Sequence, residues 1–383
     1  MKNKVFFLVI SISLAILGAA VACAPASPTQ EPSPASSPTT TPVQPPSASP
    51  VPSPEKANWQ RLVTGAQKEG TLTYYSNSLV GEIGLAVSRA FNSKYGVKVE
   101  IITGPGAEFI ERLKTERRTG QMVGDIFDSS PVNMQTLKGE GLAAFVYDDL
   151  PVTKERGVWE VEPSLADPQE RLFLPLKINY QNPVINTKLV KPSDEPRSFQ
   201  DFLNPKWKGK MTLVDPITSP GAYSLVVPLL DSGIITEDWI KKLGTQNLSF
   251  FKAAADEYGA LSRGEHSLSI RGVDTLAAPF AREGAPIKFI GMREGSVVSV
   301  TGIAVVKGGP HPNAAKLLLN WILSQEGQDV YAKAMGISSV RRDVTDYRPE
   351  AIKVINARLI VTTPEQDLRA SNLMRERWLS KLL

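Results

Sequence analysis

Helical and strand patterns alternate along the chain from residue 56 onward, and this alternation restricts the possible folds more than any other feature. Apolar residues follow a helical spacing in residues 59–70, 81–95 and 107–119, whereas residues 71–75, 97–103 and 125–127 are typical of short strands. Strands that alternate with helices form a parallel sheet with right-handed crossovers and helices on both faces. The sequence therefore predicts an α/β fold, in which Pro131 begins the next helix.

A second alternating part follows. Strands are predicted at residues 210–214, 267–270, 287–290 and 296–306, and helices at residues 221–230, 236–243, 273–283, 313–323 and 325–335. Pro364 begins a final amphipathic helix that continues to the end of the chain. The strand at residues 296–306 is too long for the edge of one lobe, so we expect it to cross between two lobes. A chain of 383 residues is also long enough for two compact units.

The amino terminus has the pattern of an export signal. Lys2 and Lys4 precede an apolar run at residues 5–17, and small residues follow it, so residues 1–22 are predicted to be a signal peptide. Residues 20–22 before Cys23 resemble the lipobox of bacterial lipoproteins, which implies that Cys23 is lipidated and anchors the protein to the cell membrane. Ordinary signal cleavage that leaves a free thiol is the alternative.

Residues 23–55 are almost entirely Pro, Ser, Thr and Ala after the cysteine, and they show no apolar periodicity. Such a segment cannot bury a core. Spaced prolines favour extended polyproline geometry, at about 3.1 Å per residue. We interpret the segment as a tether that holds the folded body away from the membrane, and a disordered leader without that purpose is the alternative.

Composition and charge exclude several classes of function. The chain has 43 basic and 39 acidic side chains and a net charge of +4, which is too balanced for a nucleic-acid-binding protein. Cys23 is the single cysteine, so neither an intramolecular disulfide nor a cysteine metal cluster is possible. With two histidines, His266 and His311, the sequence also argues against catalytic zinc. We expect no metal and no cofactor.

Polar residues follow the predicted strands of the first part of the chain. Ligands of parallel sheets bind at the carboxyl ends of the strands. The candidate ligand contacts there are Ser76, Asn77, Ser78, Ser129 and Ser130. The same residue types also serve as ordinary helix caps, and this alternative stays open for each of them.

In the second part, Arg271 follows the strand at residues 267–270, where its guanidinium could clamp a carboxylate or a phosphate. A surface ion pair with Asp274 or Glu283 is the alternative. A helix start at residues 218–223 could receive an anionic group through its N–H groups and its dipole. The further candidate ligand contacts are Tyr180, Ser219, Gly221, Ala222, Tyr223 and Asp274, of which Tyr180 is alternatively a packed aromatic residue at the hinge.

Several segments resemble the extracellular solute-binding proteins of ABC importers that have the type II periplasmic-binding fold. The resemblance rests on Lys68-Glu69-Gly70, Ala90-Phe91, Tyr95-Gly96, Gly124-Asp125-Ile126, the run at residues 204–210, His311-Pro312-Asn313-Ala314-Ala315-Lys316 and residues 324–328. It implies two lobes, residues 56–181 with 294–341 and residues 182–293 with 342–383, joined by hinges near residues 180–183 and 296–306. It also implies a monomer outside the cytoplasm that delivers a small solute to permease and ATPase subunits.

The nearest branch resembles the ferric-ion-binding proteins, whose iron is held by an adjacent pair of tyrosines. Here the matching positions carry Val273, Asp274 and Thr275. We therefore expect a small organic anion as the ligand, with direct binding of ferric ion as the alternative. A cell-surface enzyme is a further alternative, but the expected Gly-x-Ser-x-Gly elbow of a serine hydrolase is absent from residues 65–141.

Overall fold

A computed structural model describes residues 54–219, 221–354 and 358–383 of the protein. Within these ranges ten strands form one sheet. The strands are β1 (Thr71–Ser76), β2 (Lys98–Thr103), β3 (Ile126–Ser129), β4 (Leu174–Asn186), β5 (Met211–Val214), β6 (Ser249–Phe251), β7 (Leu268–Val273), β8 (Ile287–Phe289), β9 (Ser296–Val305) and β10 (Leu359–Val361). Their order is β2-β1-β3-β9-β4-β7-β5-β6, with β10 paired to β9 and β8 paired to β4.

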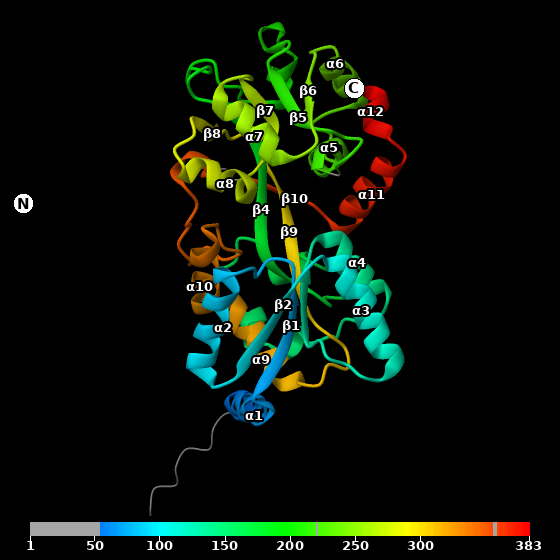
Figure 1. The fold of residues 1–383 in the computed structure, drawn as a ribbon, viewed down its shortest axis with the longest axis vertical. Helices are drawn as coiled ribbons and strands as arrows, with labels where there is room; N and C mark the ends of the chain where they lie inside the picture. Colours follow the sequence, from blue (N-terminus) through cyan, green and yellow to red (C-terminus); the bar gives the residue numbers. More distant parts are fainter. Residues whose placement is uncertain (1–53, 220, 355–357) are drawn as a thin grey trace, which may run out of the picture. The chain divides into compact units, whose positions relative to one another are not determined.

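Helices cover this sheet (Figure 1). The α-helices are α1 (Pro54–Glu69), α2 (Glu82–Tyr95), α3 (Gly106–Thr119), α4 (Pro131–Gly139), α5 (Gly221–Asp231), α6 (Glu237–Gly244), α7 (Ala254–Arg263), α8 (Asp274–Arg282), α9 (Pro312–Leu323), α10 (Gln325–Met335), α11 (Pro364–Arg375) and α12 (Trp378–Leu382). Short 3-10 helices lie at Tyr147–Asp149, Pro151–Lys154, Pro163–Leu165, Phe199–Leu203, Pro205–Trp207 and Glu350–Ile352. The α/β class expected from the sequence is confirmed.

Two main hydrophobic cores divide the elements into two groups. The first core contains buried side chains from residues 66–180 and 298–340, and we call the elements around it lobe 1. The second contains side chains from residues 185–297 and 370–379, and we call the elements around it lobe 2. A smaller cluster lies in lobe 2 between α7, α8 and β8. Figure 1 shows lobe 1 below and lobe 2 above, with β4 and β9 passing between them.

Lobe 1 follows the predicted strand and helix alternation closely. β1 pairs in parallel with β2 on one side and with β3 on the other, so their carboxyl ends meet at one edge of the sheet. Gly70 separates α1 from β1 with a φ of 71°, and its N–H donates to the carbonyl oxygen of Ala66. That left-handed conformation favours glycine, and it confirms the predicted cap of the first helix.

β4 and β9 belong to both lobes. β9 pairs with β3 through residues 302–305 and with β4 through residues 297–303, in both cases antiparallel. At its other end β4 pairs with β7 and β8 of lobe 2. The expected crossover at residues 296–306 is therefore confirmed. β4 is longer than the hinge predicted near residues 180–183, because it begins at Leu174.

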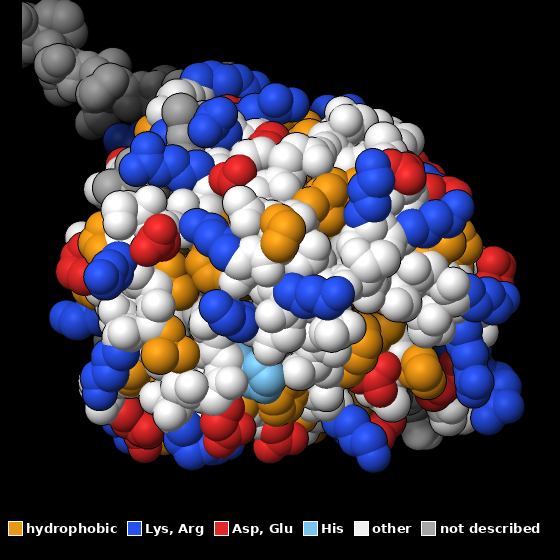
Figure 2. Space-filling view, turned by 90° about the horizontal axis from the view of Figure 1, so that it is seen from above, with side chains coloured by type: hydrophobic (Ala, Val, Ile, Leu, Met, Phe, Trp, Pro, Cys, Tyr) orange, Lys and Arg blue, Asp and Glu red, His pale blue; other side chains and the backbone are white. Residues whose placement is uncertain are grey.

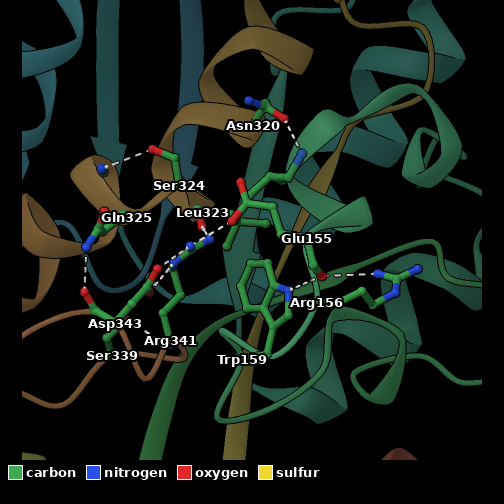
Figure 3. A network of polar contacts seen from close by, with 12 residues as sticks. Glu155, Arg156, Trp159, Asn320, Leu323, Ser324, Gln325, Ser339, Arg341 and Asp343 are labelled. Carbon is green, nitrogen blue, oxygen red and sulfur yellow. Dashed lines mark hydrogen bonds and ion pairs between the residues drawn. The ribbon is translucent and has the colours of Figure 1, made fainter.

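A network around Arg341 joins three segments of lobe 1 (Figure 3). The side chain of Arg341 is 2% exposed, and its guanidinium pairs with Asp343 at 2.8 Å and with Glu155 at 2.7 Å. It also donates to the carbonyl oxygen of Leu323 and lies 4.9 Å from the ring centroid of Trp159. The guanidinium therefore fixes the C-terminal end of α9 to the chain segments at residues 155–159 and 341–343.

The final helix differs from the sequence prediction. The sequence predicts one amphipathic helix from Pro364 to the end, whereas the structure has α11 and α12. Arg377 separates them with a φ of 53°, a left-handed conformation that cannot continue a right-handed helix. α11 contacts α5 of lobe 2 and α4 of lobe 1, so the carboxyl-terminal segment touches both lobes.

Replacing Asp367 with asparagine should stabilise the protein at alkaline pH. Asp367 lies in α11, is 8% exposed, and accepts a hydrogen bond from Thr362; its burial raises the pKa of the carboxyl group to about 7. Since this value exceeds the pKa of about 3.9 in an unfolded chain, ionisation costs stability as the pH rises from 4 to 7. We expect Asp367→Asn to raise the free energy of unfolding on the order of 2 kcal/mol at pH 8, with little change at pH 4.

Urea unfolding at both pH values measures this difference. Glu365→Gln is the matched control, because Glu365 is exposed and lies on the same turn of α11. An equal gain for Asp367→Asn at pH 4 and pH 8 would contradict the predicted linkage.

The surface of the described residues is mixed in charge. Figure 2 shows Lys and Arg side chains spread over one face, with Asp, Glu and apolar side chains between them. None of the described helices has the length and apolar character that a bilayer span requires. The predicted signal peptide, Cys23 and the tether up to residue 53 lie outside the described residues.

Candidate functional site

The carboxyl ends of β1 and β3 carry the predicted polar residues of lobe 1. Two of these residues, Ser76 and Ser78, form hydrogen bonds with other groups of the protein. The buried Ser76 hydroxyl accepts hydrogen bonds from the backbone N–H groups of Ser78 and Leu79. The Ser78 hydroxyl donates to Oδ2 of Asp128 at 2.7 Å and is also within 3.3 Å of the Tyr331 hydroxyl. Ser76 and Ser78 therefore stabilise the turn after β1. They do not cap α2, whose N-cap residue is Gly81.

The remaining lobe 1 candidates lie close together. Nδ2 of Asn77 and Nδ2 of Asn133 both donate to the hydroxyl of Ser129, at 3.3 and 2.8 Å. Gly106 packs against this group, since a Cβ atom there would lie 2.0 Å from Oγ of Ser129. Ser130 is exposed at the start of α4, and its side chain forms no capping bond. Asn77 and Ser130 thus remain accessible at this edge.

Arg271 of β7 is the cation of lobe 2 that the sequence analysis proposes as a ligand contact. Its Nε donates to Oε1 of Gln181 at 2.7 Å, and its Nη2 donates to the hydroxyl of Ser224 at 3.2 Å. Both acceptors are neutral. The expected alternative, an ion pair with Asp274 or Glu283, is wrong, because no described carboxylate pairs with Arg271.

The guanidinium of Arg271 lies directly against the start of α5. A Cβ atom on Gly221, the first residue of this helix, would lie 2.7 Å from Nη1 of Arg271. The hydroxyl of Ser219 accepts a bond from the N–H of Gly221. Two sources of positive potential, the guanidinium and the helix amino terminus, therefore coincide.

Glu257 of α7 is the carboxylate whose charge acts on the guanidinium of Arg271. It is fully buried, and its Oε1 accepts a hydrogen bond from Thr212 at 2.7 Å, while Oε2 has no partner among the described groups. Burial raises the pKa of Glu257 and lowers the pKa of Arg271. Glu257 forms no ion pair with Arg271, so the guanidinium keeps only the neutral partners Gln181 and Ser224.

Two expected contacts in α5 are part of the core instead. Ala222 and Tyr223 are both 0% exposed. The Tyr223 hydroxyl accepts a hydrogen bond from the N–H of Leu379 in α12, at 3.2 Å. The Tyr223 side chain thus joins α12 to α5, and any contact of Ala222 and Tyr223 with a ligand would have to come from their backbone N–H groups, as the sequence analysis expects.

Tyr180 and Asp274 form a buried cluster at the hinge. Oδ1 of Asp274 accepts bonds from the N–H groups of Tyr180 and Thr275, and its Oδ2 lies 3.5 Å from Nη1 of Arg348. The Arg348 guanidinium lies 4.2 Å from the ring centroid of Tyr180. Burial raises the pKa of Asp274 to about 6. Asp274 is therefore corrected to a structural residue, and Tyr180 fits the hinge alternative.

The sequence analysis missed polar residues on β4. Lys177, Asn179 and Gln181 alternate along this strand and share one face of it. Asn179 donates to the hydroxyl of Thr301 and accepts from the hydroxyl of Thr275, both at 3.4 Å, so it joins β9 to the start of α8. The period-two pattern of polar residues at 177, 179 and 181 is the signal for these residues, and the sequence analysis predicts no strand there.

The tyrosines of the described residues do not supply a phenolate pair. Tyr74 and Tyr331 lie near Asp128, and both are fully buried. Burial and the neighbouring carboxylate raise the pKa of both hydroxyl groups. The hydroxyl of Tyr258 accepts the N–H of Val273 at 2.7 Å. These environments favour neutral phenols, whereas ferric ion requires anionic oxygens.

A cavity lies elsewhere in lobe 1, away from the candidate ligand contacts. It has a volume of about 670 Å³ and is lined by α1, α9 and the segment at residues 148–154. Its charged groups pair with each other, as Lys154 does with Glu55 and Lys316 with Asp149. None of the candidate ligand contacts lines it.

The fold and the polar groups at the lobe junction are those of a two-lobed binding protein. Residues 86–354 match the family described as "Bacterial extracellular solute-binding protein", which is more than half of the chain. The chain belongs to this family, as the resemblance of its motifs implied, and it is a solute-binding protein of the kind that serves ABC importers. Members of the family are binding proteins rather than enzymes, and they act outside the cytoplasm.

Individual relatives are distant. The chain is 25% identical over 267 residues to a Salmonella typhimurium protein named "Putative 2-aminoethylphosphonate-binding periplasmic protein". The match covers 67% of this chain and 73% of the relative. Iron-bound HitA from Pseudomonas aeruginosa has a TM-score of 0.60 and 22% identity and covers 80% of this chain and 98% of its own. AfuA from Actinobacillus pleuropneumoniae, with fructose-6-phosphate bound, has a TM-score of 0.55 and 20% identity, with coverages of 82% and 97%. The two structural likenesses concern the fold.

Proposed function

We propose that this protein captures a small organic anion between its two lobes and delivers it to the permease and ATPase subunits of an ABC importer. The proposed lobes are residues 56–181 with 294–341 and residues 182–293 with 342–383. The observation that carries the proposal is Arg271, whose guanidinium lies against Gly221 at the start of α5 and has only neutral partners, Gln181 and Ser224.

Electrostatics favours an anion at this place. A cation near the amino terminus of a helix is unfavourable by about 0.3 to 1 kcal/mol, because the helix dipole is positive there. An anionic group bound between Arg271 and α5 would turn this repulsion into two attractions, and the planar guanidinium suits a carboxylate, phosphate or phosphonate. Ser130 and Asn77 of lobe 1 are the accessible groups that we propose for the opposite side of the ligand.

The relatives support an anion with a phosphorus oxyacid group. The Salmonella typhimurium relative is named for a phosphonate, and AfuA was solved with a sugar phosphate. A phosphonate or phosphate carries the charge and the acceptor oxygens that Arg271 and the start of α5 can bind. We therefore propose a small organophosphonate or organophosphate as the first class to test.

Direct binding of ferric ion is the second candidate, because HitA was solved with iron. The positions expected to match the tyrosine pair carry Val273, Asp274 and Thr275, and Asp274 is committed to Arg348. Val273 and Thr275 are neutral and the carboxylate of Asp274 is engaged by Arg348, so these positions offer ferric ion too little free anionic oxygen. If the purified protein binds ferric ion tightly and shows a phenolate charge-transfer colour, direct iron binding would replace the anion proposal. We propose no catalytic activity.

A thermal unfolding screen tests the proposed function. Small phosphonates, phosphate esters and carboxylates are compared with neutral sugars and with amines at equal concentration. A solute at one hundred times its Kd stabilises the folded protein by about 2.7 kcal/mol, which raises the melting temperature visibly. Stabilisation by neutral sugars or amines alone would contradict an anionic ligand.

Binding should close the two lobes. If β4 and β9 bend near residues 180–183 and 296–306, an anion that contacts both lobes shifts the population from open to closed. Small-angle X-ray scattering with saturating ligand should then give a smaller radius of gyration than without it. An unchanged radius, for a protein whose ligand-free lobes are first demonstrated to be open, would refute closure.

Lipid anchoring is proposed at Cys23. Two or more acyl chains hold a protein on a membrane, since each buried methylene contributes about 0.8 kcal/mol. Cys23→Ala should therefore release the protein from the membrane fraction or block its processing, as cell fractionation and mass spectrometry of the amino terminus can measure. Cofractionation of the variant with membranes, to the same extent as the parent, would exclude this anchor.

A further inference from the structure

Lys177 of β4 has a charged side chain without a partner at the lobe junction. The side chain is mostly buried, and burial lowers the pKa of its ammonium group. Among the described residues, its Nζ has neither a hydrogen-bond acceptor nor an ion pair. A partly buried ammonium whose three donors bind no group of the protein is costly, because it has lost part of its hydration.

The two carboxylates that act on Lys177 form no hydrogen bond with it. Oδ2 of Asp128 in lobe 1 accepts the hydroxyl of Ser78, while its Oδ1 has no partner among the described groups. Asp274 of lobe 2 accepts two backbone N–H groups and pairs with Arg348. Both attract the ammonium only through space. The donors of Lys177 therefore remain free for an acceptor that is not part of the chain.

Lys177 and Arg271 stand at the two ends of one polar row. Lys177, Asn179 and Gln181 lie on the same face of β4, and Gln181 holds Nε of Arg271. Four residues of strand correspond to about 13 Å between the Cα atoms of Lys177 and Gln181. β4 pairs with β9 without a bulge from Lys177, which lies opposite Thr301, to Gln181. One cation thus marks each end, and the neutral amide of Asn179 lies between them.

We propose that Lys177 is a second anion-binding residue of the ligand site, so that the solute carries an anionic group at each of its two ends. One anionic group binds Arg271 and the start of α5, and the other binds the ammonium of Lys177. This inference rests on the proposed function and narrows it from any small organic anion to one with two separated anionic groups.

The arrangement also selects against zwitterions. A ligand that places a phosphonate at Arg271 and an ammonium at its far end would bring that ammonium toward Lys177. Like charges in a partly buried site repel each other strongly, because the low local dielectric strengthens the interaction. A carboxylate at the same far end would instead form a charge-assisted hydrogen bond with Lys177.

Three probes that differ only at the far end test the inference by isothermal titration calorimetry. They are 3-phosphonopropionate, ethylphosphonate and 2-aminoethylphosphonate, which carry a carboxylate, a methyl group and an ammonium group. We expect 3-phosphonopropionate to bind at least about tenfold more tightly than ethylphosphonate, as one charge-assisted hydrogen bond implies. We expect 2-aminoethylphosphonate to bind more weakly than ethylphosphonate.

Lys177→Met should remove the preference for the carboxylate, so that the variant binds 3-phosphonopropionate and ethylphosphonate with affinities within a factor of about two of each other. Without ligand this variant should unfold at the same or a higher temperature, since a buried unpartnered charge is lost. Lys177→Gln, which keeps a polar side chain, provides the same comparison if the methionine variant folds poorly. Lys188→Met, at an exposed lysine just beyond the end of β4, is the matched control and should change nothing.

Two results would overturn the inference while leaving the proposed function in place. One is tighter binding of 2-aminoethylphosphonate than of 3-phosphonopropionate to the parent protein. The other is an unchanged preference for the carboxylate in both Lys177 variants. Failure of all three probes to bind would instead contradict the phosphonate ligand of the proposed function, and with it this inference.

Discussion

Arg271→Ala should weaken the binding of the anionic solute by about one to two orders of magnitude, because a charge-assisted hydrogen bond contributes about 1.5 to 3 kcal/mol. The guanidinium is held in place by Gln181 and Ser224, so the ligand does not have to order a flexible side chain. Calorimetric titration with the best anion from the thermal screen measures the loss. Arg271→Lys should recover only part of the affinity, since an ammonium lacks the planar fork of donors.

The control is Arg263→Ala, at an exposed arginine of the same lobe that pairs with Glu265. We expect this variant to bind the anion as the parent does. Equal affinity of Arg271→Ala and the parent would exclude Arg271 from the site. Circular dichroism of each variant ensures that the comparison is made between folded proteins.

Arg341→Met should destabilise the protein by about 2 to 4 kcal/mol, although Arg341 lies outside the proposed ligand site. The substitution removes two ion pairs, the bond to the carbonyl oxygen of Leu323 and the contact with Trp159. The carboxylates of Glu155 and Asp343 are partly exposed, so water compensates some of the loss. The segments that Arg341 joins in Figure 3 would then be held mainly by apolar packing.

Urea unfolding followed by tryptophan fluorescence measures this effect. Arg342→Met is the matched control, because its neighbouring guanidinium is 62% exposed and pairs with a single carboxylate, Glu160. Exposed pairs contribute about 0 to 1 kcal/mol, so the control should lose much less stability. Similar losses in the two variants would contradict the role assigned to the buried network.

The fold was largely predictable because its apolar patterns are strong and local. Gly70 and Pro131 mark boundaries that depend on backbone geometry alone, and both were placed correctly. β4 was underestimated, since its interior alternates polar and apolar residues and its full length is visible only in its pairing with β9 and β7. The break at Arg377 has no such local signal, because a left-handed arginine depends on packing beyond its own segment.

The location of the ligand site remains a prediction, and its contacts were not predictable from the sequence. Arg271 was expected just after a strand that ends at residue 270, but β7 continues to Val273, so Arg271 lies inside the strand. The rule that ligands bind at strand ends predicts a site at the edge that carries Ser129. It could not assign Asp274 to Arg348, because these residues are 74 positions apart in the chain. It also could not reveal Lys177, whose importance comes from acceptors that are missing around it rather than from a motif.

The chain order of the first core has a consequence for biosynthesis. Lobe 1 needs side chains from residues 66–180 and also from residues 298–340, which a ribosome makes only after most of lobe 2. A chain emerging amino terminus first therefore cannot complete this core until nearly its whole length has been synthesised. Its contacts between distant residues also make folding slow. Lobe 1 of the nascent protein thus cannot complete its core, or pair β3 with β9, until residues 298–340 have been made.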